Sequence, residues 1–98
     1  MIDGDSIPID AELTRTTRWF DETTVPAGLL AAHQIAAKTW GRLIVESGAL
    51  DFTFEEGDDV TVSLRAGDVM VIPPSRAHHV TPGSTVKFCV EFYRESGA

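Results

Sequence analysis

Apolar and polar residues alternate along three stretches in the second half of the chain. In residues 50–54 and 60–64, leucine, phenylalanine or valine occupies every other position, and polar residues lie between them. Successive side chains of a β-strand point to opposite faces, so each stretch predicts a strand with one buried face. The acidic, glycine-containing segment 56–59 between them predicts a hairpin turn. Residues 86–93 alternate in the same way and predict a terminal strand.

Two shorter runs, residues 43–45 and 69–72, are apolar at consecutive positions. Such runs are typical of strands that are covered on both faces, inside a closed barrel or at a subunit interface. The prolines at 73 and 74 end the second run, because proline cannot donate a hydrogen bond to a central ladder. Residues 28–38 are rich in alanine and leucine, and both a short helix and a strand reaching a barrel mouth fit them.

Several short strands separated by turn signals predict an all-β sandwich or barrel. The 98 residues suffice for a single domain, which we place at residues 13–95. Four of the first twelve residues are acidic and none is basic, so residues 1–12 are expected to form a solvated acidic leader.

Composition and charge exclude several classes of partner. The net charge is −7, from 15 acidic and 8 basic residues, and a surface of this sign repels nucleic acid. No stretch approaches the ~18 apolar residues that a membrane-spanning helix needs, and the N-terminus does not resemble a signal peptide. The single cysteine, Cys89, excludes an internal disulfide. We therefore expect a cytoplasmic protein without membrane or nucleic-acid partners.

The three histidines are His33, His78 and His79. Neighbouring residues of a strand face opposite ways, so His78 and His79 cannot both line an interior. Histidine is also common in cores and on surfaces, so two separated histidines alone are weak evidence for a metal site.

Residues 67–78 (Gly-Asp-Val-Met-Val-Ile-Pro-Pro-Ser-Arg-Ala-His) resemble the second cupin motif, with Ser75 in place of its usual second glycine. The resemblance implies a small cupin, a double-stranded β-helix or jelly-roll barrel, with His78 returned to the inner face. In metal-binding cupins this histidine is a ligand. The first cupin motif is degenerate: its glycine matches Gly48, its glutamate falls on Gly41, and its histidine pair is reduced to His33. The usual site of three histidines and one glutamate is therefore not intact.

The chain further resembles the TehB-like (tellurite-resistance) small cupins over about residues 13–94. The matching segments are residues 25–30, His33, residues 39–43, 72–74, 78–80 and 90–94. The resemblance favours a strand for residues 28–38, and it connects the chain with resistance to oxyanions such as tellurite, or to stress. The strands that are apolar on both faces leave sheet surface to cover, and small cupins commonly pair through such a surface, so we expect a homodimer. Relatives also precede a methyltransferase, but this sequence has no Gly-rich nucleotide loop, so we expect a cupin without that activity.

Within this family the resemblance implies a replacement metal site of His33, His78 and Glu91. Two imidazoles and a carboxylate suit a divalent ion such as Zn, Fe, Mn or Ni. The alternative is that Glu91 pairs with Arg42 or Arg18 as a structural ion pair. Four further residues are candidates for a ligand pocket, each with a simpler structural interpretation in packing or solvation: Arg42, Trp40, Cys89 and Tyr93.

Two hypotheses of function remain open. The first is a cupin that binds a metal or a small ligand, including an oxyanion, inside the barrel. The second is a non-catalytic sensor or accessory module whose barrel is filled by side chains such as Phe88. The sequence assigns no catalytic residue. An open interior around His78 would favour the first hypothesis, and a filled one the second.

Overall fold

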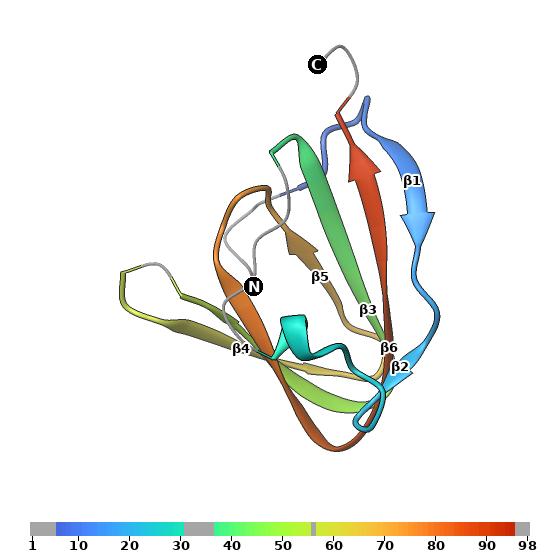
Figure 1. The fold of residues 1–98 in the computed structure, drawn as a ribbon, viewed down its shortest axis with the longest axis vertical. Helices are drawn as coiled ribbons and strands as arrows, with labels where there is room; N and C mark the ends of the chain where they lie inside the picture. Colours follow the sequence, from blue (N-terminus) through green and yellow to red (C-terminus); the bar gives the residue numbers. More distant parts are fainter. Residues whose placement is uncertain (1–5, 31–36, 56, 96–98) are drawn as a thin grey trace.

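The computed structural model describes residues 6–30, 37–55 and 57–95. These residues form an antiparallel sheet and one turn of 3₁₀ helix (Figure 1). The elements in chain order are β1 (Glu12–Thr16), β2 (Phe20–Asp21), η1 (Ala27–Leu29), β3 (Thr39–Phe54), β4 (Val60–Arg65), β5 (Val69–Ile72) and β6 (His78–Arg94). The strand order is β1-β6-β3-β4, with β2 beside β6 and β5 beside β3.

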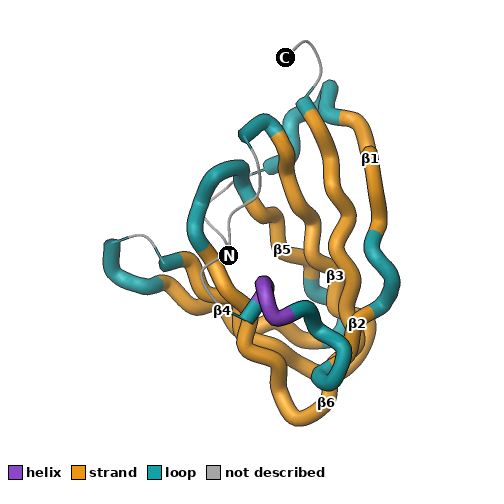
Figure 2. Tube along the Cα trace, in the orientation of Figure 1, coloured by secondary structure: helices purple, strands orange, loops and turns teal. Residues whose placement is uncertain are grey.

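The long strands β3 and β6 pair along most of their length and bend together at two irregularities, between Val45 and Ser47 and between Gly48 and Leu50. Gly48 has a φ of +74°, and a Cβ atom there would lie 2.0 Å from the Thr85 carbonyl oxygen. Only glycine fits this close approach of two backbones. The bend allows the sheet to fold over on itself, as Figure 2 shows.

Each half of the folded sheet contains one end of both long strands. In one half, residues 39–45 of β3 lie between β5 and the C-terminal part of β6. In the other half, residues 49–54 of β3 lie between β4 and the N-terminal part of β6. The buried apolar side chains form one core: Leu43, Val45, Leu50, Phe52, Phe54, Leu64, Met70, Ile72, Val80, Val86, Phe88 and Val90.

The alternating stretches predicted the strands correctly. Residues 50–54 and 60–64 lie in β3 and β4, which form the predicted hairpin, with Phe54 opposite Val60. Strand β5 has the bounds predicted for the second apolar run. The terminal strand is longer than residues 86–93, because it begins at His78. Residues 43–45 and 50–54, predicted as separate strands, belong to one continuous strand.

The strand favoured for residues 28–38 is wrong at its beginning. Ala27–Leu29 form a 3₁₀ helix, in which Leu29 N donates to the Pro26 carbonyl at 2.9 Å. Pro26 precedes this turn with a φ of −60°, a value that proline fixes, and its missing N–H is not needed there. Residues 31–36 lie outside the described part of the chain. Among the described residues, no helix has the length and apolar character that crossing a membrane requires.

Candidate functional site

A cavity of about 200 Å³ lies among the strands and η1. Its lining residues come from both halves of the sheet and from the N-terminal segment: Arg15, Thr17, Phe20, Pro26, Gly28, Leu29, Leu43, Phe52, Ile72, His78, Val80, Val90 and Phe92. Most of these side chains are apolar. Within the described part of the chain, Arg15, Thr17 and His78 bring the only polar side chains to the wall.

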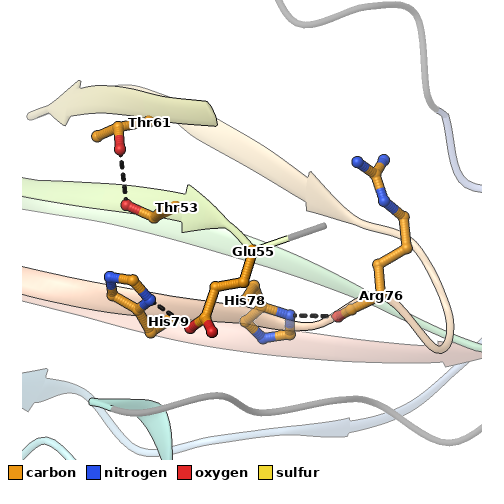
Figure 3. A network of polar contacts seen from close by, with 6 residues as sticks. All are labelled: Thr53, Glu55, Thr61, Arg76, His78 and His79. Carbon is orange, nitrogen blue, oxygen red and sulfur yellow. Dashed lines mark hydrogen bonds and ion pairs between the residues drawn. The ribbon is translucent and has the colours of Figure 1, made fainter. Parts of the chain in front are cut away.

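His78 is the first residue of β6 and is buried in this wall, with 1% of its surface exposed. Its Nδ1 lies 3.0 Å from the Arg76 carbonyl oxygen, as Figure 3 shows. A carbonyl can only accept, so Nδ1 is the donor of this hydrogen bond. The imidazole also stacks on the Phe52 ring, at 5.1 Å between centroids and 20° between planes. Two contacts therefore fix the orientation of the ring.

The turn that delivers His78 has a left-handed residue at Ser75, whose φ is 62°. This is the position at which the cupin motif usually has glycine, which adopts such a φ without strain. Serine is held there instead, so the turn is formed at some conformational cost. The expectation that the proline turn returns His78 to the inner face agrees with its burial.

His79 points away from the cavity. Its Nδ1 contacts a carboxylate oxygen of Glu55, at the end of β3 (Figure 3). Thr53 lies opposite His79 in the register. The hydroxyl groups of Thr53 and Thr61 form a hydrogen bond of 2.8 Å. The sequence left open which of the two adjacent histidines lines the interior, and the structure assigns that position to His78.

The structure does not bring Glu91 together with His78. Val90 and Phe92 line the cavity, so Glu91 between them points to the opposite face of the sheet. There its Oε1 accepts a hydrogen bond from the Tyr93 hydroxyl at 2.8 Å and lies 3.8 Å from Arg42 Nε. Of the two interpretations of Glu91, the ion pair with Arg42 is the one found.

The described residues do not assemble the metal site suggested by the family resemblance. His33 lies outside them, and Glu91 lies on the other face. No group of three or more histidine, cysteine, aspartate or glutamate side chains in residues 6–30, 37–55 and 57–95 is placed to hold a metal ion.

The four ligand-pocket candidates also lie away from the cavity. They share the outer face of β3 and β6 with Glu91, and the register pairs Trp40 with Tyr93 and Arg42 with Glu91. Cys89 lies opposite Ile44 on the same face. Trp40 donates from Nε1 to a carboxylate oxygen of Glu95 at 2.8 Å. The four residues predicted to line a ligand pocket are therefore neighbours in the structure, but they lie on the outer face, which does not line the cavity.

Two titratable groups of this outer face are shifted toward their neutral forms. The hydrogen bond to Glu91 raises the pKa of the Tyr93 phenol, and burial and the charge of Glu91 add to the effect. Burial raises the pKa of the Cys89 thiol, and the charges of Glu91 and Glu46 raise it further. Metal ligation and nucleophilic attack require the thiolate, so this shift opposes a soft-ligand role for Cys89.

Sequence reasoning missed Arg15. Its guanidinium carbon lies 4.9 Å from the centroid of the Phe92 ring, in the cavity wall. A one-residue bulge in β1, between Leu13 and Arg15, determines which way this side chain points. The hydrophobic pattern contains no signal for that bulge, so Arg15 could not be assigned to the interior from the sequence.

Comparison with known proteins agrees with this architecture. A protein from E. coli (strain K12) superimposes with a TM-score of 0.85 at 24% identity, over 94% of this chain and 98% of that one. TehB from Haemophilus influenzae gives 0.81 at 20% identity over 89% of this chain, which matches only 32% of that longer protein. A cupin-2 domain protein from Shewanella frigidimarina gives 0.59 at 21% identity, over 88% of this chain and 72% of that one.

At these identities the structural similarities establish the fold, which is that of a small all-β cupin. Among curated protein sequences, none matches the chain. The sequence profile of the TehB-like domain, in contrast, matches residues 15–90, which is most of the chain. The chain therefore belongs to the TehB-like family.

Proposed function

We propose that this cupin domain binds a small, mainly apolar molecule in the cavity, and that His78 is the buried polar group that orients it. The observation that carries the proposal is the open volume of about 200 Å³ beside a fixed imidazole. Apolar cavities of about 150 Å³ can hold benzene, so this one suits a molecule with one ring and a small substituent. Binding sites of this kind combine an apolar wall with a few fixed polar groups.

The position of Phe88 favours the hypothesis of a ligand-binding barrel over that of an accessory module filled by side chains. Phe88, the side chain considered as a plug, is fully buried and packs on Phe20, with 5.7 Å between ring centroids. Phe88 does not line the cavity, and His78 does.

Simple energetics place the affinity for a minimal ligand in a measurable range. Burying about 150 Å² of aromatic surface at ~25 cal/mol/Å² contributes about 4 kcal/mol. A hydrogen bond to one polar group of the wall adds about 1 kcal/mol. Dissociation constants of roughly 0.1–1 mM follow for a ring-sized probe.

The direct test is a titration with benzyl alcohol, followed by protein NMR shifts. We expect saturable binding by the parent and loss of binding in Ile72→Phe, which puts a ring into the cavity wall. Val71→Phe is the matched control, because its side chain lies on the other face of the same strand, opposite Arg42. If Ile72→Phe does not fold, Leu29→Phe fills the same cavity from η1. Equal affinity in a folded cavity-filling variant and the parent would overturn the proposal.

A metal at His78 is the second candidate, favoured by the bond between His78 Nδ1 and the Arg76 carbonyl. Metal-binding histidines are commonly held this way, with the opposite nitrogen toward the ion. The described residues alone do not fit a metal, because they supply one imidazole where a catalytic zinc site uses three protein ligands. A site for Zn, Fe, Mn or Ni would need further ligands from outside the described residues, and His33 is the candidate that the sequence offers there.

Elemental analysis decides this second candidate. The untagged parent is compared with His33→Ala and His78→Ala, all purified identically. Near-stoichiometric metal that is lost in both variants would support it. No bound metal after incubation with Zn, Mn, Ni and Fe(II) would rule it out. Metal affinity should also fall below about pH 6, because only neutral imidazole binds metal.

We also propose, from the family resemblance, a role in resistance to tellurite or a related oxyanion. Survival of tellurite by cells that express the parent, compared with cells that express the folded His78→Ala variant, tests this role. Equal tolerance of tellurite in both would contradict a resistance role that depends on His78 and the cavity.

A further inference from the structure

A bulge in β1 directs Arg15 into the cavity wall. Glu12 and Leu13 pair with Arg94 and Tyr93, and a regular ladder would continue with Arg15 opposite Glu91. Instead the register shifts by one residue, and Arg15 lies opposite Phe92. Directly opposed residues share a face of the sheet, so the shift moves Arg15 from the outer face to the cavity face. Without the bulge, Arg15 would lie beside the carboxylate of Glu91.

Arg15 is the one permanently charged side chain among the described residues of the wall. The ion pairs formed between described residues do not include Arg15. Its partner in the structure is the face of the Phe92 ring, 4.9 Å from the guanidinium carbon. The guanidinium N–H groups lie in the plane of the group, in a fork that matches the two oxygens of a carboxylate.

We propose that the natural ligand is a small amphipathic anion: an apolar body of about one ring, carrying a carboxylate that pairs with Arg15. This inference rests on the proposed function, since it names the class of molecule bound in the same cavity. The apolar body is buried against side chains such as Leu43, Phe52 and Ile72. The carboxylate stays at the exposed rim, where Arg15 supplies the charge that an apolar wall lacks.

The test compares two probes of nearly equal shape, benzoate and benzyl alcohol, by NMR titration at neutral pH. The proteins are the parent, Arg15→Gln, Arg15→Lys and the matched control Arg18→Gln, which removes a nearby arginine that does not line the cavity. We expect the parent to bind benzoate about fivefold more tightly than benzyl alcohol, as a charge-assisted pair at an exposed rim allows. Arg15→Gln should abolish this preference, Arg15→Lys should keep part of it, and Arg18→Gln should keep all of it.

The outcomes separate this inference from the proposed function. If benzyl alcohol binds the parent and benzoate binds no better, the anionic class is wrong while the apolar site stands. If a preference for benzoate survives Arg15→Gln, the assignment of the carboxylate to Arg15 is wrong. If neither probe binds the parent, the proposed function itself fails.

Discussion

The inner and outer faces of the paired strands β3 and β6 differ in chemistry. The inner face carries apolar side chains such as Leu43, Val90 and Phe92, with His78 as its deeply buried polar group. The outer face carries a chain of polar contacts, in which Arg42 and Tyr93 both approach the Glu91 carboxylate. Five of the six described residues that suggested chemistry in the sequence lie on the outer face, and only His78 among those six lines the cavity on the inner face.

The two faces also differ in what a polar group costs and contributes. An ion pair such as Arg42–Glu91, with side chains 43% and 23% exposed, competes with water and contributes about 0–1 kcal/mol. A buried polar group such as His78 must be bonded, and losing its bond costs about 1–3 kcal/mol. Few polar groups therefore suffice to orient a ligand on the inner face. Removing one of them should change stability or binding by more than removing a polar group of the outer face.

The largest expected difference between the faces concerns packing. Phe52 is fully buried and packs on both His78 and Phe54, so Phe52→Ala should destabilise the fold by about 3–5 kcal/mol. Val69, 41% exposed at the outer end of β5, is the control, and Val69→Ala should cost less than about 1 kcal/mol. Urea unfolding of both variants measures the difference. Similar losses would show that the outer face is also a packed core, as a covered interface would be.

The second largest difference concerns the polar groups of the two faces. His78→Ala removes the ring that stacks on Phe52 and the donor to the Arg76 carbonyl, and should cost about 2–4 kcal/mol. Arg42→Ala removes one partner of a partly exposed ion pair and should cost about 0–1 kcal/mol. Both are measured by urea unfolding at neutral pH. An Arg42→Ala loss as large as that of His78→Ala would contradict the ranking.

The fold could be predicted further than the site. Strict alternation specified the β3–β4 hairpin, because a strand with one buried face leaves that pattern in the sequence. The cupin motif placed His78 inside, and the structure buries it there. The 3₁₀ helix at Ala27–Leu29 was missed because composition does not separate a short turn from a strand.

The prediction of the site residues was wrong for a more specific reason. Alternation in the last strand already put Glu91 on its polar face, and only the family resemblance suggested a ligand role. Arg15 was missed because one extra residue in β1 reverses the face to which the side chains after it point. A pattern of hydrophobic residues records which face is buried, but an exposed strand such as β1 leaves no such record. The homodimer expected from the sequence concerns contacts between two chains, and it stays a prediction.

The outer network can be tested through the single tyrosine. Because Tyr93 donates to Glu91, its pKa is raised, and Glu91→Gln should bring that pKa down toward the ordinary value of about 10. A raised pKa in the folded state contributes stability below the unfolded value, and this contribution is lost as the pH rises through the folded value. Ultraviolet absorbance titration follows the phenolate directly, since the chain has one tyrosine. Arg15→Gln, on the other face, should leave the midpoint unchanged, and an unchanged midpoint in Glu91→Gln would refute the network.

The smallest expected effect is on the reactivity of the Cys89 thiol. Its pKa is raised mainly by burial and less by the charges of Glu91 and Glu46. A raised pKa leaves little thiolate at neutral pH, so the native thiol should react with Ellman's reagent far more slowly than the same thiol in urea. Glu91→Gln removes only a secondary cause and should speed the native reaction by about two- to threefold, with no change in urea. Since Cys89 is 5% exposed, access limits the reaction more than charge does. A rate in Glu91→Gln that approached the unfolded rate would mean that the outer network, and not packing, protects the thiol.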